Sequence, residues 1–198
     1  MNTIRTALAG ATLAFAASFA GASTLAGNLG DSGNTALVGS DLGLPDFTDD
    51  NAIADNVALY VFTVSVGGSV SIVSTGFAGG GVDPYFTLFT GSGNSATFLD
   101  SDYTQATTTG GDFAWSGTLA PGSYEIALGV FENLSFAENL GTGTLGDGFI
   151  ALGDPNALGS GRYVLSLTMP VPEPTSAWLM AIAFAALATR ARRGRRGG

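Results

Sequence analysis

The side chains of this chain that could do chemistry are its carboxylates. Its 198 residues include 16 Asp and Glu and 7 basic residues, all of them Arg, with no His and no Cys. A chain without His, Cys and Lys has no Ser-His-Asp or Cys-His nucleophile, no zinc site of the usual ligand set and no Schiff-base lysine. Paired carboxylates alone can hydrolyse a glycosidic bond. Most of these acids fall in turn-like segments, where a solvated turn residue is the commoner role, so we expect no catalytic residues and no enzyme.

Calcium is the cation that these acids are best suited to hold, because it prefers hard oxygen ligands. Two short clusters offer them, Asp100-Ser101-Asp102 and Asp49-Asp50-Asn51. The EF-hand pattern fails, since a loop starting at Asp100 has Gln105 where Gly is needed and Gly111 where the final Glu is needed. We expect no cofactor, and Asp100 and Asp102 are the first candidates if calcium binds.

Aromatic side chains offer a second kind of binding surface, a platform for sugar rings. Most of them are expected to fill the core of a β-sheet protein. Trp115 and Tyr103 are the two that a platform would expose. The full candidate set is Tyr85, Phe86, Phe89, Phe98, Tyr103, Phe113 and Trp115.

Strand-like alternation runs through the middle of the chain. In Val57–Val66 every second residue is apolar, Gly67-Gly68 follows as a turn signal, and Ser69–Ser74 alternates again, which predicts a hairpin. Pro84–Thr90 is a short aromatic strand closed by a second hairpin-like turn. Helical spacing with capping signals is absent. The expected fold is all-β, an antiparallel sandwich with further strands at 112–119, 124–130 and 163–167.

The segment from 23 to 169 forms the expected single domain, and it is strongly acidic. Arg162 is its one basic residue, and Glu173 is the one acid of the chain outside it. This composition excludes nucleic acid and anionic lipid as partners, because both need a cationic surface. With no cysteine, the fold rests on its core alone.

The N-terminus has the pattern of an export signal in residues 1–22. A short positive segment ending at Arg5 precedes the apolar stretch Ala7–Ala20. Ala20-Gly21-Ala22 supplies the small-x-small pattern of signal peptidase, which predicts cleavage between Ala22 and Ser23.

The C-terminus, residues 170–198, combines a chain breaker, an apolar segment and a positive end. Pro172 and Pro174 keep the chain extended, and Thr175–Thr189 is uncharged and long enough for a thin or temporary membrane anchor. Five arginines then hold the end on the cytoplasmic side. The alternative is an ordinary helix with a solvated basic end, but it leaves the order of the three parts unexplained. The arginines are Arg190, Arg192, Arg193, Arg195 and Arg196.

This tail resembles the PEP-CTERM sorting signal of Gram-negative bacteria. The residues that carry the resemblance are Val171, Pro172, Glu173 and Pro174, followed by the apolar segment and the arginines. The resemblance implies a membrane protease of the exosortase type as partner, which reads the motif and cuts there. It also implies export across the inner membrane, a transient membrane anchor formed by a C-terminal transmembrane helix, and delivery to the cell surface or beyond.

The body resembles the bacterial pre-peptidase C-terminal (PPC) domain, a jelly-roll-like β-sandwich of exported proteins. The matching phrases are 56–64 (NVALYVFTV), 82–89 (VDPYFTLF), 119–126 (LAPGSYEI) and 161–165 (GRYVL). Asn133–Gly161 is longer than the resemblance implies, and we expect it to be an extended Gly-rich loop at one edge.

Two function classes follow from these observations. The favoured one is a non-catalytic surface or extracellular-matrix protein, delivered by its tail. The alternative is a carbohydrate-binding module, calcium-dependent in one form, associated with exopolysaccharide. A glycoside hydrolase is the third, and it needs two carboxylates facing each other across a cleft.

Overall fold

The regular secondary structure of the folded body is mostly β-strand. The computed structural model separates Ala20–Val171 as one compact unit from a second unit formed by the two chain ends. Secondary structure in the body consists of nine strands, one short α-helix and two 3-10 turns within the part of the chain that is described. The described residues are 20–34, 38–39, 56–102, 107–109, 111–130, 133–150, 160–172, 182 and 184.

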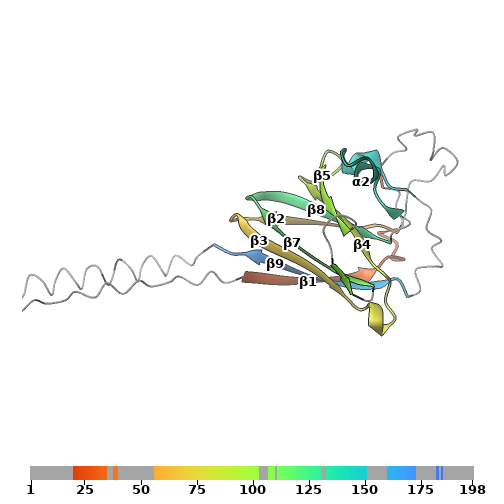
Figure 1. Ribbon diagram of the computed structural model, residues 1–198, viewed down its shortest axis with the longest axis horizontal. Helices are drawn as coiled ribbons and strands as arrows, with labels where there is room; N and C mark the ends of the chain where they lie inside the picture. The colour runs from red at the N-terminus through yellow and green to blue at the C-terminus, as the bar shows by residue number, and fades with distance from the viewer. Residues whose placement is uncertain are drawn as a thin grey trace, which may run out of the picture. The chain divides into compact units, whose positions relative to one another are not determined.

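The larger sheet joins the two ends of the body. Its five antiparallel strands lie in the order β1-β9-β3-β7-β6, and Figure 1 shows β1 running alongside β9. Nine residues of β1 pair with nine of β9, from Ala20 opposite Pro170 to Asn28 opposite Arg162. The strands are β1 (Ala20–Asn28), β3 (Gly68–Thr75), β6 (Thr107–Thr109), β7 (Asp112–Leu119) and β9 (Arg162–Pro170).

The smaller sheet has four antiparallel strands in the order β2-β8-β4-β5. They are β2 (Ala58–Val64), β4 (Tyr85–Thr90), β5 (Thr97–Ser101) and β8 (Gly122–Gly129). β4 and β5 form the hairpin expected after Thr90, with a register shift between Leu88 and Phe89. Together the two sheets make a protein that is mostly β and consistent with the expected antiparallel sandwich.

The hairpin predicted from Val57 to Ser74 is wrong. β2 pairs with β8, whereas β3 pairs with β7 and β9 in the other sheet. Gly67-Gly68 therefore carries the chain from one sheet to the other instead of turning it back on its neighbour. Ala120-Pro121 makes the same kind of crossing between β7 and β8.

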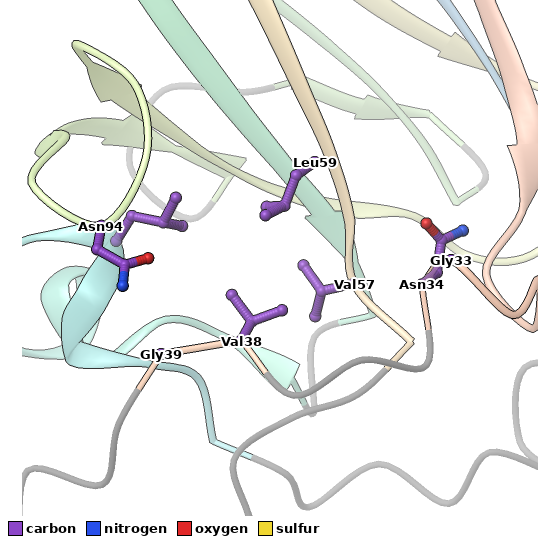
Figure 2. Close-up of a pocket in the computed structure, with 8 residues that line it drawn as sticks. Gly33, Asn34, Val38, Gly39, Val57, Leu59 and Asn94 are labelled. Atoms are coloured by element: carbon purple, nitrogen blue, oxygen red, sulfur yellow. The ribbon is translucent and has the colours of Figure 1, made fainter.

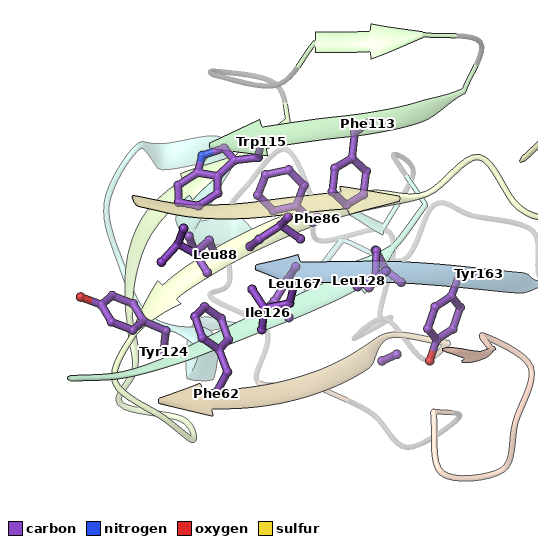
Figure 3. Close-up of a cluster of buried hydrophobic side chains, with 14 of the residues drawn as sticks. Phe62, Phe86, Leu88, Phe113, Trp115, Tyr124, Ile126, Leu128, Tyr163 and Leu167 are labelled. Carbon is purple, nitrogen blue, oxygen red and sulfur yellow. The ribbon is translucent and has the colours of Figure 1, made fainter. Parts of the chain in front are cut away.

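The main core lies between the two sheets and is rich in aromatic rings. Phe86 and Phe113 face each other across it with ring centroids 4.6 Å apart, and Phe62 stacks on Tyr124 at 5.6 Å. Figure 3 shows these rings together with Ile126 and Leu128 from β8 and Leu167 from β9. The alternation predicted for 163–167 is confirmed, since Tyr163, Leu165 and Leu167 are all buried.

A second, smaller core covers part of the outer face of the four-stranded sheet. Helix α2 (Phe136–Leu140) and the 3-10 turn η4 (Leu145–Asp147) supply apolar residues that pack on Phe89 and Ala127. The expectation of an extended loop from Asn133 is thus wrong as far as Ile150, and so is the expected absence of capped helix. Ser135 caps α2 by accepting the amide of Glu138 at 3.0 Å, because Ser-x-x-Glu is a capping pattern.

Apart from residues 20–22, 182 and 184, the segments expected to cross or enter the membrane lie outside the described residues. Within the described part of the chain, no helix reaches the length and hydropathy needed for a membrane span. The boundaries predicted at Ser23 and Met169 stay predictions, and the compact unit itself runs from Ala20 to Val171.

Candidate processing site at the end of the last strand

The C-terminal motif begins directly where the last strand ends. β9 finishes at Pro170, Val171 is half-buried and Pro172 is exposed. No loop separates the sandwich from the motif, because the strand geometry runs up to the residue before Val171. The remaining predicted motif residues Glu173 and Pro174 and the five C-terminal arginines lie outside the described residues.

The predicted signal-peptidase site lies within β1. Ala20, Ala22 and Ser23 all belong to this strand, and Ala22 and Ser23 are exposed. A cut before Ser23 would remove the first three of the nine β1 residues that pair with β9. The cut predicted from the sequence and the strand found in the structure therefore overlap by three residues.

The predicted signal-peptidase site lies beside Val171, the first residue of the predicted C-terminal motif, which the sequence alone did not indicate. Ala22 is opposite Thr168, and Ala20 is opposite Pro170. Gly21 lies against the motif itself, since a methyl group added to it would come within 2.8 Å of Val171 Cγ1. The signal that could have found this is weak, because the strands are far apart in sequence (Asn28 and Ser160 are 132 residues apart) and antiparallel pairing leaves no local sequence pattern.

Asp100 has a structural role at the edge of the core. Its Oδ1 accepts the Ser101 amide at 2.9 Å, and its Oδ2 accepts Trp115 Nε1–H at 2.9 Å. Both oxygens of this carboxylate are therefore engaged by the protein. In the described part of the chain, no three acidic side chains gather in a way that would hold a metal ion. Asp100 and Asp102 are two residues apart in sequence, and their role as calcium ligands stays a prediction.

Asp102 and Glu138 form the most perturbed group of acids among the described residues. Glu138 accepts hydrogen bonds from Tyr85 Oη and, at 3.0 Å, from Thr87 Oγ1. Burial raises the pKa of Glu138, an effect that these hydroxyl donors oppose. Burial and the nearby charges of Asp83 and Glu138 raise the pKa of Asp102 to about 6. The carboxylate of Glu138 is thus bound by Tyr85 and Thr87; that the chain is no glycoside hydrolase stays a prediction.

The predicted aromatic platform is wrong for Trp115. This indole is 3 % exposed and packs in the main core, as Figure 3 shows, with its N–H bound to Asp100. Five of the seven candidate aromatics are buried, Phe98 is half-buried, and Tyr103 lies outside the described residues. The buried five are Tyr85, Phe86, Phe89, Phe113 and Trp115.

A shallow pocket of about 240 Å³ opens beside the small core (Figure 2). Val38, Val57 and Leu59 give it an apolar wall, and Asn34 and Asn94 are its two amides. None of its eight lining side chains ionises, so they provide no acid, base or nucleophile.

Comparison with known protein families supports the sorting signal predicted at the C-terminus. Residues 170–196 match the family model of the PEP-CTERM protein-sorting motif. The motif implies export, a transient membrane anchor and processing by an exosortase, a membrane protein, on the way to the cell surface. No curated protein matches the chain, and the PPC-like resemblance of the body stays a prediction.

Proposed function

We propose that this chain is a non-catalytic surface or extracellular-matrix protein, released from its transient anchor by an exosortase-type protease in a Gram-negative bacterium. The observation that carries the proposal is the position of the motif. Residues 170–196 match the sorting motif, and they begin at the last residue of β9 with Pro172 exposed. A protease can therefore reach the motif while the sandwich stays folded.

The acids of the body support a non-catalytic role. Asp100 holds Trp115, Glu138 holds Tyr85 and Thr87, and Asp147 caps η4 by accepting the amide of Thr144 at 2.7 Å. Each of these carboxylates has a structural partner that accounts for its position. We infer that the body serves as a structural or interaction module.

The experiment is the intact mass and location of the protein in its native host, with and without the protease gene. A secreted chain beginning at Ser23 and ending near Pro172–Pro174, seen only when the protease is present, is the expected result. A chain ending at Gly198 in the membrane fraction of the normal host would overturn the proposal.

The alternative function is that of a module that binds exopolysaccharide. Because Trp115 is buried, it cannot form the aromatic platform for such binding. A pull-down with the host polysaccharide tests it, using Tyr103→Ala and Leu59→Ala as variants. Binding lost with Tyr103→Ala and kept with Leu59→Ala would favour a sugar-binding face at the 103–106 segment. Loss of binding with Leu59→Ala alone would favour the pocket of Figure 2.

A further inference from the structure

The prolines at the end of β9 recur at every second residue. Pro170, Pro172 and Pro174 alternate with Met169, Val171 and Glu173. In an extended chain, residues two apart present their backbone N–H and C=O groups to the same edge. Proline has no N–H, so one edge of this segment has lost its donors. The other edge keeps every donor and acceptor.

The structure shows which edge is complete. Leu29 donates its amide to the carbonyl of Gly161 at 2.8 Å, so Gly161 faces β1. Arg162 faces away from β1, because its carbonyl accepts the amide of Val82 at 2.9 Å. β1 and β9 pair without a register shift. The odd-numbered residues of β9, up to Met169, therefore face β1, and Pro170 faces the β3 side.

The start of β1 covers this complete edge at Met169. Gly21 is opposite Met169, and its backbone faces β9 by the same alternation. Val171 is the next residue on this edge, and its side chain lies beside Gly21, since a methyl group added to Gly21 would come within 2.8 Å of Val171 Cγ1. The predicted cut before Ser23 removes this cover, since Ala20–Ala22 leave with the signal peptide.

We propose that the sorting protease binds the tail as an added β-strand, along the backbone edge that Met169 and Val171 present, and that the start of β1 covers this edge at Met169 until the signal peptide is removed. Strand addition uses backbone hydrogen bonds for affinity, and a one-sided strand fixes the register and direction of binding. The prolines on the opposite edge keep the same segment from pairing with a second strand. This inference rests on the proposed function, because it assumes that the tail is cut.

The first test changes one backbone donor at a time in the full-length chain, expressed in the native host. Tail loss is followed by pulse–chase with an antibody against the body. Val171→Pro removes a donor from the complete edge, and it is made together with Pro170→Ala so that no run of three prolines forms. Val171→Ala and Pro170→Ala alone are the controls, since both keep the donor of residue 171.

The expected result is cutting slowed about tenfold in the Pro170→Ala/Val171→Pro chain, with both controls within about twofold of the wild type. Equal slowing by Val171→Ala would mean that the side chain, not the backbone edge, is read, and would overturn the proposal. So would normal cutting of the double variant. If the wild-type chain is never cut, the proposed function itself is contradicted, not only this inference.

The second test keeps residues Ala20–Ala22 attached to the chain by blocking the signal-peptidase cut. Ala22→Leu blocks signal peptidase by placing a bulky side chain before the cut, and Ala22 is exposed, so β1 can accept it. We expect the tail to stay on this uncut chain. Adding Gly21→Pro removes the backbone donor facing Met169 and should restore the tail cut without restoring the signal cut. Tail loss at the normal rate from the Ala22→Leu chain would contradict the covering role of β1.

Discussion

Asp102→Asn should change how the stability of the body depends on pH. Asp102 is half-buried, its Oδ1 has no hydrogen-bond partner among the described residues, and the charges of Asp83 and Glu138 lie nearby. Burial and these charges favour the protonated acid in the folded state. Replacing the carboxyl with an amide removes the titration and keeps the shape.

The sign of the effect follows from the direction of the pKa shift. The pKa of Asp102 is about 6 in the folded protein against an ordinary value of 3.8. Between these values the folded state binds the proton more tightly, so the free energy of unfolding falls as the pH rises from about 4 to about 6. The full shift would correspond to about 3 kcal/mol, and solvent screening of a half-exposed group reduces this to about 1 kcal/mol.

The assay is urea unfolding of the secreted, mature protein at pH 4 and pH 7. The wild type should lose about 1 kcal/mol more than Asp102→Asn over this interval. Asp83→Asn is the matched variant, because it removes one neighbouring charge and should give an intermediate pH dependence. Identical pH dependence in the wild type and Asp102→Asn would refute the reasoning, since Asp102 would then titrate alike in both states.

Three further predictions concern side chains with defined partners. Asp100→Ala leaves the buried Trp115 N–H without its acceptor and should cost about 2 kcal/mol in the free energy of unfolding, with a shift in tryptophan emission. Phe86→Ala should cost about 3–5 kcal/mol in the same urea assay, because this ring is fully buried against Phe113; a cost below 1 kcal/mol would contradict the packing. Ser135→Ala removes the cap of α2 and should cost about 1 kcal/mol, whereas Ser135→Asp should keep most of the stability.

Local patterns predicted the strands and their faces, but not which strand pairs with which. The alternation at Tyr163, Leu165 and Leu167 was enough to place them in the core. Gly67-Gly68 was ambiguous, because the same flexible pair serves a hairpin or a crossing between sheets. The choice depends on distant partners, β8 for β2 and β9 for β3.

Helix α2 was missed although its signal is local. Ser135 and Glu138 have the spacing of a capping pair, and Phe136 and Ala137 provide a buried face. The helix is only five residues long, too short for a helical period to show. Its glycine-rich surroundings favoured the prediction of a loop.

The sorting motif could be predicted because it is read as a short linear sequence. The residue that lies beside the motif could not be predicted. Gly21 and Val171 are brought together only by the pairing of β1 with β9, the first and last strands of the body. Trp115 was named as a platform candidate for a related reason. A tryptophan with a polar N–H suits an exposed platform or a buried site equally well, and the acceptor on Asp100 decides between them.

The pairing of β1 with β9 also has a consequence for the time at which the protein folds. In the described sheet β1 pairs with β9 alone. The two strands are about 130 residues apart in sequence. Contacts this distant form slowly, and none of them can form before the last strand has been translocated. We therefore expect the chain to cross the membrane unfolded. Until β9 has crossed, β1 has no partner strand, and its backbone is accessible to aggregation or to chaperones. The completed sandwich would then appear only as the C-terminal anchor enters the membrane.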